Sequence, residues 1–231
     1  TLISLVSFLY FTEEKNKKRV IAIFGRYVSA PVAKKILEDA EKRIEALKGT
    51  EREITVLFSD IRGFTAMSEK LKPREVVNIL NKYLAEMSNA VLKYDGTLDK
   101  YTGDGLMAFF NAPLDQKEHA LLAIKSALDM QKAIDKINLK RKKKVHCGIG
   151  INTGKAVIGN IGSEHRHDFT AIGDTVNTAA RLCSVAKPNE ILISETTYKK
   201  VKSKIKVKKL APVKVKGKEK PLQIYLVLGL K

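Results

Sequence analysis

This chain is organised around the stretch Leu98-Asp99-Lys100-Tyr101-Thr102-Gly103-Asp104-Gly105-Leu106-Met107-Ala108-Phe109-Phe110. An alternating apolar run enters a Gly-Asp-Gly corner and a second apolar run leaves it, which predicts a β-hairpin. Asp104 is the carboxylate at the tip of this hairpin. Because Asp-Gly is a preferred turn pair in hairpins, Asp104 taken alone indicates a turn more readily than a functional group.

A second aspartate ends an apolar run upstream of the hairpin. The run Ile54-Thr55-Val56-Leu57-Phe58-Ser59-Asp60 predicts a strand, and it leads into Ile61-Arg62-Gly63-Phe64-Thr65. Two strand-end carboxylates that meet would suit a divalent metal ion, which prefers hard oxygen ligands. The alternative is that Asp60 is the N-cap of the helix that follows.

The remaining patterns alternate between helices and strands. Apolar residues at helical spacing predict a core-facing helix that opens at Pro73 and is ended by Asp95-Gly96. Hairpins interspersed with packed helices indicate an α+β sandwich. The other expected elements are a helix over 116–137, a hairpin of strands 145–152 and 155–161 that turns at Asn152-Thr153-Gly154, a strand over 168–172, a helix over 175–184, and final strands at 191–194 and in the lysine-rich tail.

The composition is that of an ordinary globular domain except for its charge. With 231 residues and 44% hydrophobic content, the chain can bury one sizeable core plus appendages. The formal net charge of +18 comes largely from lysine-dense segments at 136–144 and 199–220. An exposed, solvated surface is the favoured interpretation, and attraction to nucleic acid or anionic lipid is the alternative. No aromatic stacking platform is interleaved with the lysines, which argues against binding of single-stranded nucleic acid.

The N-terminus is an uncharged, mostly apolar segment, residues 1–11. Eleven residues of helix rise about 16 Å, roughly half the hydrocarbon core of a bilayer. Four cationic residues follow between Lys15 and Arg19, which is the charge bias expected on the cytoplasmic side. We therefore interpret residues 1–11 as the end of a transmembrane helix, with an interfacial helix or a packed N-terminal arm as the alternative.

A helical pattern continues through residues 12–51, with a restart at Pro31 and a close at Lys48-Gly49-Thr50. Such a connector between a membrane segment and a compact domain could transmit a signal, or it could be a passive, dimerising spacer. Residues 52–231 then form the globular domain.

Four stretches of this domain resemble, in order, the motifs of the class III nucleotidyl cyclases. The resemblance covers about residues 52–228, and Phe24-Gly25-Arg26-Tyr27-Val28-Ser29 is similar to the connector ahead of such domains in bacterial, membrane-sensor-linked members. It implies an α+β fold with a ferredoxin-like (palm-type) βαββαβ sheet, helices packed on that sheet, and a head-to-tail homodimer. The matching stretches are Phe58–Thr65, Lys100–Gly105, Gly148–Gly154 and Asp168–Arg181.

The resemblance implies that the domain converts ATP into 3′,5′-cyclic AMP and diphosphate, with the ribose 3′ oxygen attacking the α-phosphorus. Phosphoryl transfer of this kind depends on positioning and charge neutralisation. By resemblance, Asp60, Asp104 and the Ile61 carbonyl hold Mg²⁺ or Mn²⁺, two ions per site. The backbone amides of Gly63-Phe64-Thr65, where a strand turns into a helix N-terminus, would bind the phosphates.

The resemblance also assigns two residues to the purine, Lys100 and Thr170. A lysine four residues before Asp104 is typical of adenylyl cyclases, whereas guanylyl cyclases generally carry glutamate there. Many adenylyl cyclases have aspartate at the position of Thr170. A threonine hydroxyl can still accept a hydrogen bond from the adenine amino group, and it is similar to a subgroup that includes bicarbonate-responsive members.

Three more residues complete the implied substrate site. Asn177 and Arg181 are four residues apart on one predicted helix and therefore share a face. In the family this asparagine orients the ribose and this arginine stabilises charge on the transferred phosphoryl group. The segment Val215-Lys216-Gly217-Lys218 matches the one whose lysine contacts the terminal phosphates, which is Lys216, with neighbouring lysines as alternative registers.

In the family that the chain resembles, the site is built across a head-to-tail pair, with the metals from one subunit and the base, ribose and transition-state groups from the other. Because this chain carries both sets of residues, the resemblance implies a homodimer with two shared active sites. The expected partners are ATP, a second copy of the chain and, through the N-terminal segment, the cell membrane, with the catalytic domain in the cytoplasm as the output of signal transduction and no nucleic acid bound. The alternatives are a guanylate cyclase, a catalytically inactive nucleotide-binding regulatory domain and, from composition alone, a basic nucleic-acid-binding module.

Overall fold

The computed structural model describes residues 14, 28–29, 34, 49–139, 141, 144–163, 166–214 and 221–231. The predicted membrane segment, most of the predicted connector, and Lys216 lie outside these residues. Within the described part of the chain, no helix has the length and apolar content needed to cross a membrane.

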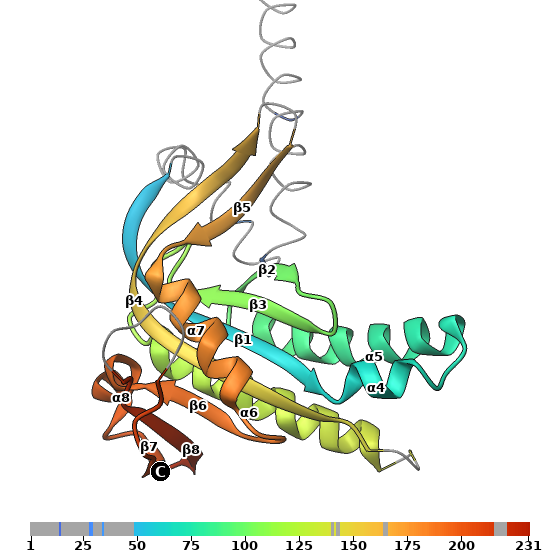
Figure 1. Ribbon diagram of the computed structural model, residues 1–231. Coiled ribbons are helices and arrows are strands. Elements are labelled where there is room, and N and C mark those ends of the chain that lie inside the picture. Colours follow the sequence, from blue (N-terminus) through green and yellow to red (C-terminus); the bar gives the residue numbers. More distant parts are fainter. Residues whose placement is uncertain are drawn as a thin grey trace, which may run out of the picture.

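The first half of the domain is a split βαβ arrangement. Its elements in chain order are β1 (Thr50–Arg62), α5 (Pro73–Leu92), β2 (Thr97–Tyr101), β3 (Gly105–Phe110), α6 (His119–Asn138) and β4 (His146–Ser163). The strands lie in the order β2-β3-β1-β4, and each neighbouring pair is antiparallel. This order, with one long helix between β1 and β2 and another between β3 and β4, confirms the predicted ferredoxin-like βαββαβ sheet (Figure 1).

The second half extends the same sheet. The element β6 runs parallel to β4, β8 and β7 follow beyond it, and β5 pairs with the far end of β4. Figure 1 shows β4 and β5 rising together away from the rest of the sheet. These elements are β5 (Arg166–Ile172), α7 (Asp174–Val185), β6 (Ile191–Ser194), α8 (Glu195–Val201), β7 (Ile205–Lys209) and β8 (Ile224–Leu230), and the short α4 (Phe64–Ser68) follows β1.

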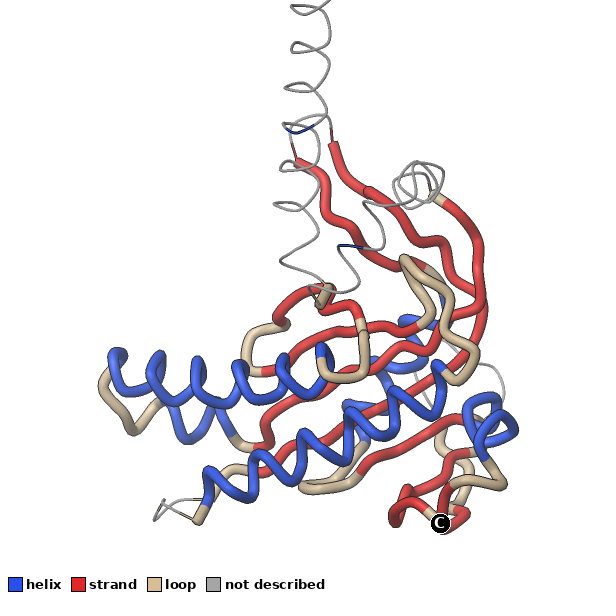
Figure 2. The backbone as a smooth tube through the Cα atoms, turned by 180° about the vertical axis from the view of Figure 1, so that it is seen from behind, coloured by secondary structure: helices blue, strands red, loops and turns tan. Residues whose placement is uncertain are grey.

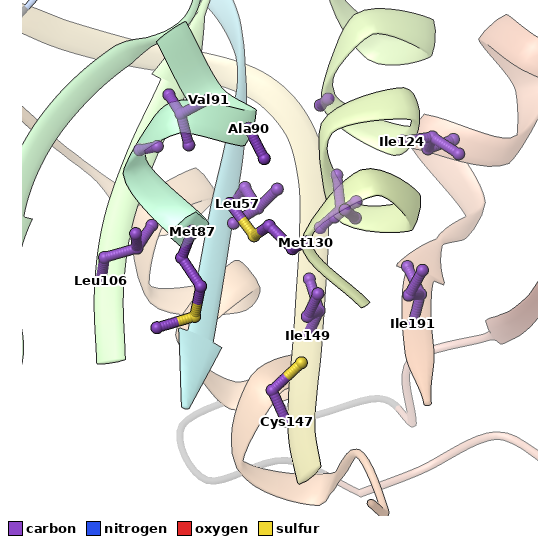
Figure 3. Close-up of a cluster of buried hydrophobic side chains, with 14 of the residues drawn as sticks. Leu57, Met87, Ala90, Val91, Leu106, Ile124, Met130, Cys147, Ile149 and Ile191 are labelled. Atoms are coloured by element: carbon purple, nitrogen blue, oxygen red, sulfur yellow. The ribbon is translucent and has the colours of Figure 1, made fainter. Parts of the chain in front are cut away.

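Helices cover both faces of the sheet, so alternate residues of β1 enter two different cores. Leu57 packs with Met87 and other side chains of α5 and α6 on one face (Figure 3). Val56 packs with Phe109 and with Ala179 of α7 on the other face. Figure 2, seen from behind, shows α5 and α6 lying over the same side of the strands. The continuous apolar run of β1 reflects this burial on both faces.

The sequence prediction was wrong at residues 145–161, which form the single strand β4 and not a hairpin. The expected turn at 152–154 lies in mid-strand, opposite residues 54–56 of β1. Its polar side chains find partners elsewhere in the fold: Thr153 Oγ1 lies 2.8 Å from Thr55 Oγ1, and Asn152 Nδ2 donates to the Thr175 carbonyl at 3.0 Å. Tertiary hydrogen bonds therefore override the turn composition, and β4 makes its hairpin with β5 instead.

Helices α5 and α6 confirm the two long helices predicted from apolar periodicity. Helix α8 was not predicted. Its N-cap is Ser194, whose side chain accepts a hydrogen bond from the Thr197 amide. The sequence contained this signal, because a serine followed by an acidic residue is typical of a helix start.

Candidate functional site

Two strand-end aspartates meet at one end of the sheet. The pairing of β1 with β3 sets Asp60 opposite Gly105, so that Asp104, the residue before it, lies beside the end of β1. A Cβ built on Gly105 would overlap the Ser59 carbonyl oxygen. Only glycine allows the two strands to approach this closely, and the approach brings the two carboxylates together.

The two carboxylates influence one another. Burial, and then the negative charge of Asp60, raise the pKa of the Asp104 carboxyl. Because a divalent cation would remove the repulsion between the two groups, this donor set fits a hard cation such as Mg²⁺ or Mn²⁺. Ile61 is 2% exposed, so its side chain is part of the core and its carbonyl is the candidate ligand. No group of three or more His, Cys, Asp or Glu side chains suited to a metal occurs among the described residues, so other oxygens would complete the coordination.

Arg62 was not predicted as a functional residue, yet its guanidinium group contacts the Asp60 carboxylate. Its Nη1 donates to Asp60 Oδ2 at 2.5 Å, and its Nη2 donates to the Cys183 carbonyl on α7. Arg62 therefore supplies one positive charge at the carboxylate pair and ties the end of β1 to α7. Residues two apart on a strand share a face, so the sequence held a signal for the first contact but none for the second.

The segment after Asp60 turns sharply into α4. Gly63 is the N-cap of this helix, with φ +71°, a left-handed conformation that other residues rarely adopt. The alternative role of Asp60 as the N-cap is therefore wrong. Phe64 is buried and anchors the turn, whereas Gly63 and Thr65 are exposed. The predicted phosphate-binding segment is thus accessible and close in sequence to Asp60.

The structure brings the two predicted purine-binding residues together through a third residue, Asp99. Thr170 Oγ1 donates to Asp99 Oδ2 at 2.5 Å, and Lys100 Nζ lies 3.2 Å from Asp99 Oδ1. Thr170 is buried, and nearly half of the Lys100 side chain is exposed. A lysine that can donate therefore lies near a hydroxyl. No local pattern indicated a role for Asp99, because its partner Thr170 is on a strand far away in the chain.

The last two described site residues lie on α7. Asn177 is exposed, and Arg181 is partly buried, with a buried Nη1 that has no hydrogen-bond partner among the residues that the structure describes. Within the described residues, no hydrogen bond or ion pair joins Asp60 or Asp104 to Lys100, Thr170, Asn177 or Arg181. The polar side-chain contact of Asp60 that the structure describes is instead with Arg62.

Comparisons with known proteins give the same relatives by sequence and by structure. A family model described as the adenylate and guanylate cyclase catalytic domain matches residues 47–229. Adenylate cyclase 1 of Rhizobium meliloti (strain 1021) is 33% identical over 222 residues, which are 93% of this chain and 33% of that protein. The chain therefore spans about a third of the length of this curated relative.

Two solved structures resemble the domain almost equally. The adenylyl cyclase CyaB from P. aeruginosa is 40% identical with a TM-score of 0.77, over 80% of this chain and 98% of that one. The guanylyl cyclase Cya2 is 38% identical, also with a TM-score of 0.77, over 80% of this chain and 96% of that one. Overall similarity to these two structures therefore does not distinguish adenine from guanine, and the distinction depends on the residues of the site.

Proposed function

Because this chain belongs to the family of adenylate and guanylate cyclase catalytic domains, we propose that it converts ATP into 3′,5′-cyclic AMP and diphosphate. The observation that carries the choice of ATP is the cluster of Lys100 and Thr170 around Asp99. Lysine donates to the unprotonated ring nitrogen of adenine, and the threonine oxygen accepts from the 6-amino group. In the reaction the ribose 3′ oxygen bonds to the α-phosphorus, the bond from that phosphorus to the diphosphate oxygen breaks, and the 3′ hydroxyl proton leaves to water.

Asp60, Asp104 and the Ile61 carbonyl would hold the divalent cations, Mg²⁺ or Mn²⁺, two per site. The donor set described above supports this assignment, because two carboxylates of like charge lie together and one has a raised pKa. Bound cations lower the pKa of the 3′ hydroxyl and offset the charge of the triphosphate. Members of this family use divalent metal ions, which is consistent with the proposal.

The other predicted residues act on the substrate itself. The amides of Gly63, Phe64 and Thr65 would bind the phosphates, and Asn177 would orient the ribose. Arg181 would stabilise the charge that develops on the transferred phosphoryl group, and its unpartnered, buried Nη1 is a donor available for this role. Lys216, outside the described residues, would contact the terminal phosphates.

We propose that the active site is shared between two copies of the chain in a head-to-tail homodimer. Among the described residues, no hydrogen bond or ion pair joins the two aspartates to Lys100, Thr170 or Arg181, which is consistent with this arrangement. Each copy would then supply the cations to one site and the purine and phosphoryl contacts to the other.

We propose further that the domain is held at the cytoplasmic side of the cell membrane as the output of a signalling protein. The support is the apolar segment 1–11 followed by cationic residues, with residues 12–51 as the connector and residues 52–231 as the catalytic domain. Cofractionation of the chain with membranes, lost when residues 1–11 are deleted, would be the expected result.

The deciding experiment measures cyclic nucleotide formation by the purified chain with Mn²⁺, with ATP and GTP in parallel, over a wide range of protein concentration. Cyclic AMP whose specific activity rises with concentration is the expected result, with Asp104→Asn as the inactive control. Predominant cyclic GMP would overturn the choice of ATP. Guanylate cyclase activity is the second candidate, because the chain is also similar to the guanylyl cyclase Cya2. No product at concentrations where sedimentation shows a dimer would indicate an inactive regulatory domain.

A further inference from the structure

A buried carboxylate lies between the two purine-reading residues, and none of the roles given above uses it. Asp99 is 5% exposed, and its side chain is completely buried. Its Oδ2 accepts from Thr170 Oγ1 at 2.5 Å and from the Ala171 amide at 3.4 Å. Its Oδ1 faces Lys100 Nζ at 3.2 Å without a well-aligned hydrogen bond. Burying a carboxylate is costly, so its position calls for a specific reason.

A β-bulge makes this arrangement possible. In a regular strand, the side chains of Asp99 and Lys100 would point to opposite faces of the sheet. The pairing of β2 with β3 shifts register between Leu98 and Lys100, which leaves Asp99 as the extra residue. Bulges re-aim side chains, and here the Asp99 carboxylate reaches both Lys100 on its own strand and Thr170 on β5. β2 and β5 are not neighbours in the sheet, so these hydrogen bonds link strands that share no ladder.

The direction of the hydrogen bond between Asp99 and Thr170 is fixed by its surroundings. An amide N–H can only donate, so Asp99 Oδ2 accepts in the Ala171 contact. An ionised carboxylate has no hydrogen to give, so the Thr170 hydroxyl donates its hydrogen to Asp99. A hydroxyl has one hydrogen and two lone pairs, so toward any further partner Thr170 can only accept.

We propose that Asp99 is a specificity-determining positioning residue. It accepts the hydrogen of the Thr170 hydroxyl and holds the Lys100 ammonium group beside that hydroxyl. Thr170 and Lys100 then present one acceptor and one donor to the purine. This inference rests on the proposed function for the identity of the ligand. Adenine offers a donor at its 6-amino group and an acceptor at N1, whereas a 6-oxo purine offers an acceptor and a donor at these two places. Asp99 thus prevents the Thr170 hydroxyl from rotating to donate a hydrogen bond to a 6-oxo group.

The test compares equilibrium binding of 3′-deoxy-ATP and 3′-deoxy-ITP, which lack the attacking hydroxyl and so cannot cyclise. Each nucleotide displaces a fluorescent ATP analogue from the purified chain in the presence of Mn²⁺. Inosine carries the 6-oxo group without the 2-amino group of guanine, so the ratio of the two dissociation constants isolates the feature that Thr170 reads. We expect the wild-type chain to prefer the adenine nucleotide.

Asp99→Leu keeps the γ-branched shape and removes both acceptors, which frees the Thr170 hydroxyl to rotate and donate. We expect the preference for the adenine nucleotide to fall roughly 10- to 100-fold, since a hydrogen bond involving a charged group has a net value of this order. If this variant does not fold, Asp99→Asn replaces it. That amide supplies one acceptor where the carboxylate has two, and a loss of at least about threefold is expected.

Two further variants separate positioning from general structural support. Thr170→Val should lose the preference and Thr170→Ser should retain it, because serine keeps the hydroxyl. Adding Asp99→Leu to Thr170→Val should have a smaller effect on the preference than Asp99→Leu has alone, since only the positioning of Lys100 is then left to lose. A carboxylate that serves only the fold would lower the melting temperature and the affinity for both nucleotides while leaving their ratio unchanged.

Asp129 provides a matched control. It too is a carboxylate with a lysine and a hydroxyl as partners, since Lys93 Nζ lies at 2.6 Å and Tyr94 Oη donates at 2.9 Å. These partners directly follow the end of α5, and neither belongs to the proposed site. Asp129→Asn should therefore leave the ratio of the two affinities unchanged.

Three results would overturn the inference: a wild-type chain that binds both nucleotides equally, an Asp99→Leu variant with an unaltered ratio, or a full effect of Asp99→Leu in the Thr170→Val background. Failure of the proposed function looks different. In that case the wild-type chain would still prefer 3′-deoxy-ATP and lose this preference with Asp99→Leu, but would form no cyclic nucleotide from ATP.

Discussion

The two ends of the β2–β3 hairpin treat a carboxylate in opposite ways. At the tip, Asp104 meets a second carboxylate, Asp60, and the nearest cation, Arg62, contacts Asp60. In the strand before the tip, Asp99 is surrounded by donors from Thr170, Ala171 and Lys100. The first carboxylate is left short of positive charge, as a site that receives a cation should be. The second has two donors on one oxygen and a lysine facing the other, as a residue that orients its neighbours should have.

The largest effect is expected from a change to the carboxylate pair of Asp60 and Asp104. Asp104→Asn should lower cyclase activity at least about 100-fold, since even residues that only support metal ligands contribute roughly 10- to 100-fold. The preference between 3′-deoxy-ATP and 3′-deoxy-ITP should remain, because the Asp99 cluster is untouched. A thermal scan provides a second readout: Mn²⁺ should raise the melting temperature of the wild-type chain more than that of the variant.

The metal-free stability of the same variant should change in the opposite sense. The pKa of Asp104 is raised in the folded state, so its contribution to stability is present at low pH and is lost as the pH rises through that pKa. The amide avoids this loss, so Asp104→Asn should melt higher than wild type near neutral pH in a chelator. A variant that melts lower would mean that the two carboxylates do not repel one another.

The next prediction tests whether the acidic residues and the α7 arginine of one chain serve different active sites. Asp60→Ala and Arg181→Ala should each be inactive alone. An equal mixture that exchanges subunits should recover about a quarter of wild-type activity, because half of the dimers are mixed and each mixed dimer has one intact site of two. Activity is measured after partial unfolding and refolding together, and mixing without exchange is the control. No recovery in exchanged dimers would argue against shared sites.

A smaller effect is expected on stability from the glycine that brings the aspartates together. Gly105→Ala places a methyl group against the Ser59 carbonyl and should destabilise the fold by roughly 2–3 kcal/mol, as other overpacking changes do. Gly63→Ala is the matched control, because its Cβ would meet nothing within 4 Å and only the left-handed backbone is strained. We expect about 1 kcal/mol there. Urea denaturation of both variants checks the order, and equal costs would contradict the close approach of β1 and β3.

The smallest effect compares two carboxylates by the sign of their pH dependence. Burial raises the pKa of Asp99, so its contribution to stability is lost as the pH rises through that pKa. The hydrogen bond from Lys93 lowers the pKa of Asp129, so its contribution is present at higher pH and is lost as the pH falls through that pKa. As the pH rises from about 3 to 6, the melting temperature of Asp99→Asn should rise relative to that of the wild-type chain, and that of Asp129→Asn should fall. Shifts of the same sign would contradict this assignment.

Local pattern was enough to predict the elements that carry the site. Strand β1, the β2–β3 hairpin and helices α5 and α6 follow from apolar periodicity and from turn residues adjacent in the sequence. The prediction of a turn in the middle of β4 was wrong. Its turn-like polar residues form hydrogen bonds with Thr55 and Thr175, which no local sequence pattern places nearby. The contacts of Arg62 with Cys183 and of Asp99 with Thr170 were missed for the same reason. Residue types in the sequence indicated which side chains carry the chemistry. Only the fold indicated which contacts hold those side chains in place.

The bond between Asp99 and Thr170 also limits how this domain could change its substrate. A change at Thr170 alone would strand a buried carboxylate without its donor, and a change at Lys100 alone would remove the charge that faces it. Each single step costs stability before any new base is accepted. The base preference is therefore expected to be epistatic, so that positions 99, 100 and 170 change together in an evolving lineage or not at all.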